Sequence, residues 1–377
     1  MSHYDVIIVG GGPGGSTCAS LLARGHAKVL LIDKAEFPRD KPCGDFISAR
    51  LKAELEKLQL HPPLSEMPHA PVNTISFAHP QAGSFNLVRP PAQGFICKRE
   101  DFDASLFKLA QQGVEVLQNS AVKKLLFEGD RVIGVQTEDE TYRSKIVVGA
   151  DGANGITAKA LGVETFDENH NAVAIRSYYT NIKGLQETAE LHFLDEVQPG
   201  YFWIFPLNLK TGEANVGLGI LSRNVRNANV HLKELLTKIC YEHPLFRERF
   251  AGAECSAPTK GWSLPFGSKK RPIAFPGAVL LGDAAGLIDP MSGEGIENAV
   301  RSSQCAAPIL LKALVANDFS KPFLLQYERA LEKLLRPELR QSYWIQKLCR
   351  NPLMLKGFFH VLKRSSLCRN IIANKFY

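Results

Sequence analysis

The N-terminal segment constrains the fold more than any other part of the chain. An apolar run at residues 4–9 enters the glycine-rich turn 10–15 and continues as a segment that ends at Gly25. A buried parallel strand, a G-x-G-x-x-G turn and a helix produce this pattern. Backbone N–H groups at such a turn, together with the helix N-terminus, can bind a pyrophosphate. The segment therefore predicts a dinucleotide site.

A second apolar run supports this prediction. Residues 28–32 end in Asp33, eighteen residues after Gly15, where an acidic side chain can accept hydrogen bonds from ribose hydroxyls. Glycine turns are common, so a plain βαβ core unit is the alternative. The order of strand, turn, helix, second strand and Asp33 favours the dinucleotide site.

Composition limits the class of protein. With 45% hydrophobic and 22% charged residues, the 377-residue chain is expected to form two globular domains. It contains no run of eighteen apolar residues and no signal peptide pattern, so we expect a cytoplasmic location. The eight cysteines lack C-x-x-C spacing, which favours reduced thiols and no bound metal.

The C-terminal segment is strongly basic. From residue 336 onward, nine Lys or Arg stand against one acid, Glu338, so this segment accounts for the formal net charge of +7. It lacks a base-reading pattern, and we expect no nucleic acid partner. The helix predicted after Pro352 carries Lys356, His360, Lys363 and Arg364 on one face and Met354, Leu355, Phe358, Phe359 and Leu362 on another. Such a helix either makes a peripheral contact with the inner face of a membrane or packs on the protein with its basic face in water.

The remaining segments alternate between helical and strand patterns. Helices are predicted at 48–58, 104–112, 232–250 (broken at Pro244) and from the turn at 289 to about 316; strands are predicted at 114–117, 145–150 and 278–283, in hairpins at 72–88 and 122–142, and in an antiparallel sheet at 172–221. No second G-x-G-x-x-G unit follows, and Cys43 has no C-x4-C partner. Both absences argue against the two-nucleotide disulfide reductases.

Two short motifs resemble those of FAD enzymes with the p-hydroxybenzoate hydroxylase fold. Residues 150–152 (Ala-Asp-Gly) resemble that group's DG motif, and residues 281–285 (Leu-Gly-Asp-Ala-Ala) resemble its GD motif. The resemblance implies that Asp283 bonds a ribitol or ribose hydroxyl of FAD and that Asp151 lies near the pyrophosphate. It also implies that Arg99, of the R-x-x-x-D pattern ending at Asp103, helps to hold FAD. A helix N-cap is the alternative role for Asp283.

The expected fold class is α/β (α+β). We expect a discontinuous Rossmann-like FAD-binding domain (1–71, 95–165 and 275–320), an inserted antiparallel β-sheet domain that binds substrate (72–94 and 166–274), and a C-terminal basic helical region (321–377).

Within this fold, three further stretches resemble the geranylgeranyl reductase family. Residues 38–44 resemble its Cys-Gly loop, residues 200–206 its Y-x-W-x-F-P strand, and residues 289–296 its glycine-rich loop under the flavin. The chain departs from the family after Asp45, where Phe46, Ile47 and Ser48 stand in place of further glycine. The wall of the pocket near Cys43 is therefore expected to differ.

The resemblance suggests roles for side chains whose pattern alone leaves alternatives. Tyr201, Trp203 and Phe205 share one face of a strand, where they either fill the core or form the wall of an apolar substrate tunnel. The turn 293–295 either aims backbone N–H groups at the flavin N1–C2=O edge or is a generic helix start. Cys43 either donates a proton and shapes the pocket or is a small buried hydrophobe.

The reaction implied by the resemblance is reduction of C=C double bonds of an isoprenoid (geranylgeranyl or polyprenyl) substrate by hydride transfer from reduced flavin. NAD(P)H or another reductant would supply the electrons. A monooxygenase on the same fold is the alternative, and a non-catalytic flavin-binding protein is a more distant one. The expected FAD-binding residues are Gly10, Gly12, Pro13, Gly14, Gly15, Asp33, Lys34, Cys43, Gly44, Arg99, Asp151, Gly152, Asp283, Gly293, Glu294, Gly295 and Ile296; Tyr201, Trp203 and Phe205 are expected to bind substrate, and Cys43 to be catalytic.

Overall fold

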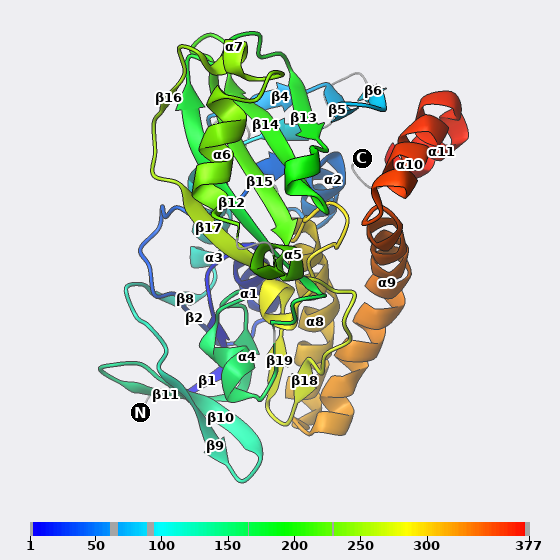
Figure 1. Ribbon diagram of the computed structural model, residues 1–377. Coiled ribbons are helices and arrows are strands. Elements are labelled where there is room, and N and C mark those ends of the chain that lie inside the picture. The colour runs from blue at the N-terminus through cyan, green and yellow to red at the C-terminus, as the bar shows by residue number, and fades with distance from the viewer. Residues whose placement is uncertain (1–2, 61–66, 89–93, 165, 228–229, 374–377) are drawn as a thin grey trace.

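The computed structural model describes residues 3–60, 67–88, 94–164, 166–227 and 230–373. Residues 89–93 of the predicted substrate domain, residue 165 at the end of a predicted FAD-binding segment, and Lys375 of the basic segment lie outside these residues. Two large sheets lie one above the other in Figure 1, and a column of helices runs beside them. The α/β class with a second, largely antiparallel sheet and C-terminal helices is confirmed.

The first sheet holds the glycine-rich turn. Its path is β18-β19-β11-β1-β2-β8, and β10 and β9 extend it from β11. The strands are β1 (His3–Val9), β2 (Val29–Ile32), β8 (Glu115–Leu117), β9 (Lys124–Glu128), β10 (Arg131–Gln136), β11 (Thr141–Gly149), β18 (Ala274–Phe275) and β19 (Ala278–Leu280). The five strands from β8 to β19 are parallel, so their carboxyl ends share one edge, where such sheets bind ligands.

Helices cover one face of this sheet. They are α1 (Pro13–Arg24), α3 (Arg99–Gln111) and α8 (Ile296–Ala316), with α9 (Lys321–Leu348) packed outside α8. Apolar side chains from these helices and from β1, β2, β11 and β19 form one buried core. A second core on the other face of the sheet includes side chains of β9 and β10.

The second sheet has the order β16-β12-β15-β14-β13-β5-β6, with β17 also paired to β12. Its strands are β5 (Thr74–His79), β6 (Gly83–Val88), β12 (Asn171–Thr180), β13 (Thr188–His192), β14 (Gly200–Asn208), β15 (Glu213–Leu221), β16 (Glu254–Cys255) and β17 (Lys260–Pro265). The predicted hairpin at 72–88 joins this sheet, because β5 pairs with β13.

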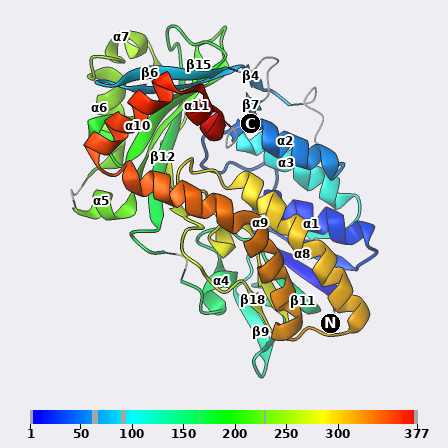
Figure 2. The same cartoon turned by 90° about the vertical axis from the view of Figure 1, so that its right-hand side faces the viewer.

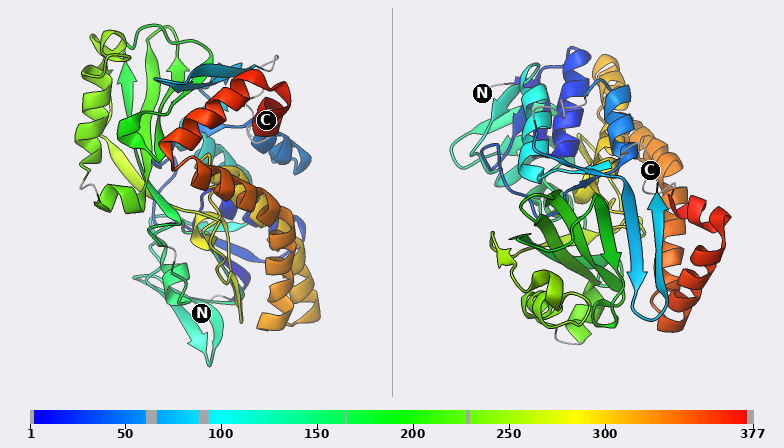
Figure 3. Two further views of the ribbon diagram at one scale, coloured as in Figure 1. Left: turned by 45° about the vertical axis from the view of Figure 1, so that its right-hand side comes forward. Right: turned by 90° about the horizontal axis from the view of Figure 1, so that it is seen from above.

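Helices lie on both faces of the second sheet. α6 (Leu232–Tyr241) and α7 (Arg247–Phe250) cover one face. On the other face, α10 (Pro352–Arg364) and α11 (Ser366–Ala373) pack near β5 and β6, as the views in Figures 2 and 3 show. α9 carries the chain from the first sheet to this position (Figure 2).

Smaller elements complete the fold. They are β3 (Phe46–Ile47), α2 (Ala49–Lys57), β4 (Ala70–Val72), β7 (Gly94–Ile96), α4 (Ile156–Ala160), the 3-10 turns η2 (Asp195–Val197) and η3 (Gly282–Ala285), and α5 (Ser222–Asn227). β3, β7 and β4 form a three-stranded sheet.

Several predicted elements differ from the structure. The strand predicted at 278–283 ends at Leu280, and Asp283 lies in η3. The helix predicted at 104–112 begins earlier, at Arg99, because Glu100 and Asp101 in its first turn favour the positive helix end. The strand predicted at 145–150 is the second half of β11, which starts at Thr141. Its first half pairs with β10 and its second half is buried between β1 and β19, so the hydropathy pattern changes within one strand.

Candidate active site

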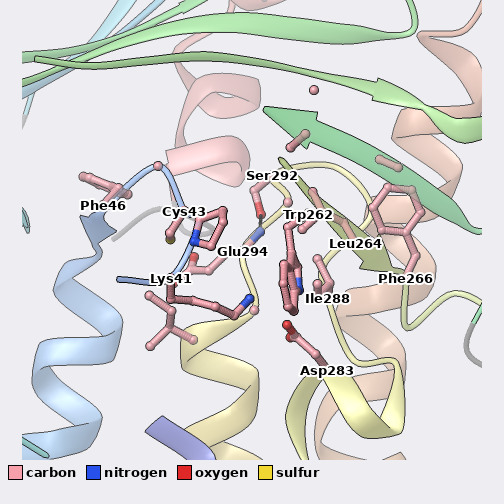
Figure 4. A pocket seen from close by; sticks show the side chains of 18 of the residues that line it. Lys41, Cys43, Phe46, Trp262, Leu264, Phe266, Asp283, Ile288, Ser292 and Glu294 are labelled. Atoms are coloured by element: carbon pink, nitrogen blue, oxygen red, sulfur yellow. Dashed lines mark hydrogen bonds between the residues drawn. The ribbon is translucent and has the colours of Figure 1, made fainter. Parts of the chain in front are cut away.

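A cavity of about 740 Å³ lies between the two sheets. Its walls come from the glycine-rich turn and the carboxyl edge of the first sheet at one end, and from β14, β5 and α10 at the other. Figure 4 shows side chains from the loop at 41–46, from β17 and from the turn before α8 projecting into it. Every residue expected to bind FAD except Gly15 lines this cavity, and so do Tyr201, Trp203 and Phe205.

The glycine-rich turn leaves open space above Gly12. A Cβ atom added to Gly12 would meet only the Nη2 of Arg39, at 3.5 Å. In contrast, a Cβ atom on Gly15 would lie 1.8 Å from the carbonyl oxygen of Gly10, so Gly15 allows close packing and does not face the cavity. α1 begins at this turn without a side-chain cap, so no side chain satisfies its first amides. This cradle fits the pyrophosphate of FAD.

Arg39 is a residue that the sequence analysis missed. Its Nη1 lies 3.0 Å from Asp103 Oδ2, and its Nη2 lies above Gly12. Arg99 donates to the same carboxylate from Nε and Nη2, at 2.6 and 2.7 Å. Burial alone would raise the pKa of Asp103, but Arg99 and Arg39 hold it below its usual value. Arg99 thus anchors Asp103, and Arg39 is the guanidinium next to the turn.

The three aspartates predicted to bind FAD have different surroundings. Asp33 accepts from the backbone N–H of Gly11 at 2.6 Å and of Ala35 at 2.9 Å. Asp151 lines the cavity, but its carboxylate accepts from the backbone N–H of Thr157 at 3.0 Å and also bonds the Thr157 hydroxyl.

Asp283 lies in η3, which has no side-chain cap. Its carboxylate accepts no hydrogen bond from the part of the chain that the structure describes, so it is available to a ligand hydroxyl.

Lys41 adds a cation that the sequence analysis did not predict. Its Nζ lies 3.9 Å from the centre of the Trp262 ring, and Figure 4 shows both side chains near Asp283. Burial lowers the pKa of Lys41 to about 8, although the Asp283 carboxylate opposes this shift. The cavity therefore has a cation and an acceptor close together where polar ligand groups would bind.

A buried polar network holds the loop that carries Cys43. Asp45 is fully buried with a left-handed backbone (φ +64°), and its Oδ2 accepts from Tyr178 Oη at 2.8 Å and from Asn215 Nδ2 at 2.7 Å. Burial raises the pKa of Asp45 to about 6, although these two donors favour the ionised form. The same Asn215 nitrogen donates to the carbonyl oxygen of Cys43 at 2.7 Å.

The thiol of Cys43 lines the cavity beside a guanidinium. Burial raises the pKa of this thiol, and the positive charge of the nearby Arg99 guanidinium opposes the shift. The thiol is therefore protonated at neutral pH, and Arg99 is placed to stabilise a thiolate.

The aromatic row on β14 forms part of the cavity wall. Tyr201 donates to the carbonyl oxygen of Ser292, and Trp203 Nε1 donates to Asn215 Oδ1 at 2.9 Å. The opposite face of β14 fills the core beneath α6 with Phe202 and Ile204. Beyond the row, the cavity is lined by apolar side chains that include Phe77, Phe85, Phe193, Leu355, Phe359 and Leu362.

Comparisons with known proteins agree with this site. Residues 3–255 match the family described as FAD binding domain. A menaquinone reductase of Mycobacterium tuberculosis is 32% identical over 315 residues, which cover 81% of this chain and 76% of that protein. A digeranylgeranylglycerophospholipid reductase of Thermoplasma acidophilum is 30% identical and covers 92% of this chain and 87% of its own length.

Solved structures extend the comparison. A geranylgeranyl bacteriochlorophyll reductase-like protein from Thermoplasma acidophilum superposes with a TM-score of 0.87 at 26% identity, over 97% of this chain and 92% of that one. The halogenase PltM in complex with FAD has a TM-score of 0.75 at 18% identity, covers 99% of this chain and 86% of that one, and shares the fold. The cavity and these similarities lead to one conclusion: the chain is an FAD-binding oxidoreductase that belongs to the geranylgeranyl reductase family.

Proposed function

We propose that this protein saturates C=C double bonds of an isoprenoid chain held in the large cavity. The observation that carries the proposal is the continuity of that cavity, which runs from the cradle at Gly12, past Cys43, to an apolar end lined by aromatic and aliphatic side chains. An extended hydrocarbon fits such a wall. The names of the two reductase relatives support the proposal, because menaquinone and digeranylgeranylglycerophospholipid both carry isoprenoid chains.

The chain's own residues would bind FAD and manage one proton. Arg39 and the α1 amides would hold the pyrophosphate, Asp33 and Asp283 would accept from hydroxyls, and the loop ending at Gly295 would present amides at the start of α8. Bound FAD, once reduced, supplies a hydride.

Cys43 would give the proton to the second alkene carbon, and Arg99 would stabilise the thiolate that remains. The aromatic row would hold the chain against the site and exclude water.

The test is product mass under strict anaerobiosis. FAD-loaded protein, reduced with dithionite, would receive geranylgeranyl diphosphate, geranylgeraniol or a menaquinone. Gain of two hydrogens per double bond supports the proposal, whereas no anaerobic product together with oxygen-dependent gain of one oxygen atom would establish the monooxygenase alternative. Cys43→Ala should lower turnover strongly, and Cys305→Ala, at a half-buried position on α8, is the matched control.

We also propose a peripheral membrane contact through exposed apolar side chains on and beside α10. Of the predicted apolar face, Leu355, Phe359 and Leu362 are buried and line the cavity, whereas Met354 is exposed. Six large apolar side chains of α9, α10 and α11 are nevertheless more than half exposed, and we call them the apolar patch: Trp344, Leu348, Leu353, Met354, Val361 and Leu367. Basic side chains flank it, and Lys347 lies 5.1 Å from the Trp344 ring centre.

An exposed apolar patch within a basic segment fits an anionic bilayer. In the described ranges, the structure has no helix long and apolar enough to cross a membrane. Because α10 has the patch on one side and the cavity on the other, a lipid substrate could pass from the bilayer around this helix.

A further inference from the structure

A second, polar cavity lies behind the turn before α8. It has a volume of about 30 Å³, which is the space of roughly one water molecule. Ser292 and Glu294 line both this cavity and the large one, so Glu294 stands at the partition between them. Figure 4 shows these two side chains at the large cavity. The other residues lining the small cavity are Arg50, Asp289, Glu297, Asn298, Leu335, Glu338 and Leu339.

Charged groups connect this cavity to the surface. The Nη2 of Arg50 lies 2.9 Å from Glu297 Oε1 and 3.0 Å from Glu338 Oε2. The Glu297 side chain is 7% exposed and that of Glu338 is 42% exposed. Glu338 and Glu294 line the same water-sized space, which therefore links Glu294 to a carboxylate at the surface.

The surroundings of Glu294 favour its protonated form. Burial raises the pKa of Glu294 well above its usual value, and the nearby carboxylates of Glu297 and Asp289 raise it further, whereas Arg50 and the Ser48 hydroxyl oppose the shift. The Ser48 hydroxyl lies 3.3 Å from Glu294 Oε1. The protonated form of the Glu294 carboxyl is therefore favoured at the partition between the two cavities.

We propose that Glu294 is the internal acid that returns a proton to Cys43 after each double bond is saturated, a role that rests on the reduction proposed above. Cys43 and Glu294 line the same cavity, and both act electrostatically on the buried hydroxyl of Tyr201.

Saturation of one double bond adds a hydride and a proton, and only the proton must come from the protein. The π bond and the Cys43 S–H bond break, and two C–H bonds form, one to the thiol proton and the other to the hydride that reduced FAD would supply. The thiolate then takes the proton from the Glu294 O–H, and solvent reprotonates the carboxylate through the small cavity.

The test compares the rate at which the first double bond is saturated with the rates for the later ones. Geranylgeraniol offers several double bonds, so FAD-loaded protein with excess dithionite would be quenched at intervals and the products weighed by mass spectrometry. In Glu294→Gln, which keeps the shape of the side chain, the later saturations should be at least tenfold slower relative to the first one than they are in wild type. Glu338→Gln, at the exposed end of the route, should also slow only the later ones. Glu332→Gln, which removes a surface carboxyl paired with Lys270 on α9, should match wild type.

A second measurement does not depend on activity. Infrared difference spectra should show a protonated carboxyl band at neutral pH in wild type that is missing in Glu294→Gln.

Equal rates for all double bonds in wild type and Glu294→Gln would overturn the inference, and so would equal slowing of the first and later ones or the absence of the infrared band. Wild-type protein that saturates no double bond would instead refute the proposed function. The infrared band alone would then decide whether Glu294 stores a proton. If Glu294→Gln does not fold, Glu338→Gln carries the kinetic test.

Discussion

The side-chain amide of Asn215 on β15 donates to the carbonyl oxygen of Cys43, a residue 172 positions earlier in the chain, over 2.7 Å. The same amide donates to Asp45 and accepts from the indole of Trp203. One buried side chain therefore joins the thiol loop to the aromatic wall. The position of the thiol relative to a bound chain depends on this connection.

Replacing Asn215 should weaken both stability and turnover. Asn215→Ala leaves the buried Trp203 N–H and the Cys43 carbonyl without this partner, which should lower the free energy of unfolding by about 2–3 kcal/mol. Turnover should fall more than substrate binding, because the thiol is displaced. Urea unfolding and anaerobic turnover measure the two effects. Asn86→Ala, an exposed position on β6, is the control, and an Asn215→Ala variant with wild-type turnover would show that the connection does not position Cys43.

Much of this fold can be predicted from the sequence because its signals are local. The strand, glycine turn, helix and Asp33 are contiguous, and the alternation at 200–206 places Trp203 on one face and Phe202 on the other without reference to the rest of the chain. Asn215 and Arg39 have no such signal, since each acquires its partners only when distant segments meet. The side toward which α10 presents its apolar face cannot be predicted from a local pattern either. It depends on a cavity that distant segments form together.

The raised pKa of Asp45 should make the stability of the protein depend on pH. The pKa of Asp45 is about 6 in the folded protein, whereas an aspartate in the unfolded chain titrates near 4. Between these values the folded state holds the extra proton, so the free energy of unfolding falls as pH rises, by about 3 kcal/mol in total. The contribution is fully present below pH 4 and is lost as pH rises through 6.

Asp45→Asn should remove this dependence while keeping a residue that tolerates a left-handed backbone. Urea unfolding at pH 4.5 and 7 would show a smaller stability difference between the two pH values in Asp45→Asn than in wild type. The exposed Asp130→Asn variant should behave like wild type. If the stability of wild type and of Asp45→Asn changed equally between pH 4.5 and 7, Asp45 would not hold a proton in the folded state.

Arg39 should contribute to FAD affinity. Arg39→Ala removes the guanidinium above Gly12 and should weaken FAD binding about tenfold, or about 1.4 kcal/mol, in fluorescence titrations of the apoprotein. Arg39→Lys should recover only part of this loss, because an ammonium lacks the planar fork. Lys57→Ala, at an exposed site on α2, serves as the control. An unchanged dissociation constant in Arg39→Ala would remove Arg39 from the FAD site.

Two glycine substitutions should separate binding from folding. Gly12→Val places a side chain in the open space of the cradle, and the backbone of Gly12 (φ −68°) accepts it, so the protein should fold but bind no FAD. Gly15→Ala forces a methyl group against the Gly10 carbonyl and should destabilise the protein itself. Circular dichroism melts with FAD titration distinguish the two effects, and a Gly12→Val variant that binds FAD normally would contradict the assignment of the cradle.

The apolar patch on the outer side of α10 should control binding to anionic vesicles. Leu353→Ser with Met354→Ser removes two apolar side chains that are 76% and 58% exposed. Burial of each one in a bilayer would contribute about 1.5–3 kcal/mol to the free energy of binding. Co-sedimentation with vesicles containing phosphatidylglycerol should therefore fall at least tenfold, and stability should be unchanged. Val315→Ser is the matched control, because Val315 is 90% exposed at the far end of α8. Added salt should weaken wild-type binding, since basic side chains flank the patch. Equal sedimentation of the double variant, the control and wild type would show that the patch does not meet a membrane, and the cavity would then have to load its substrate from solution.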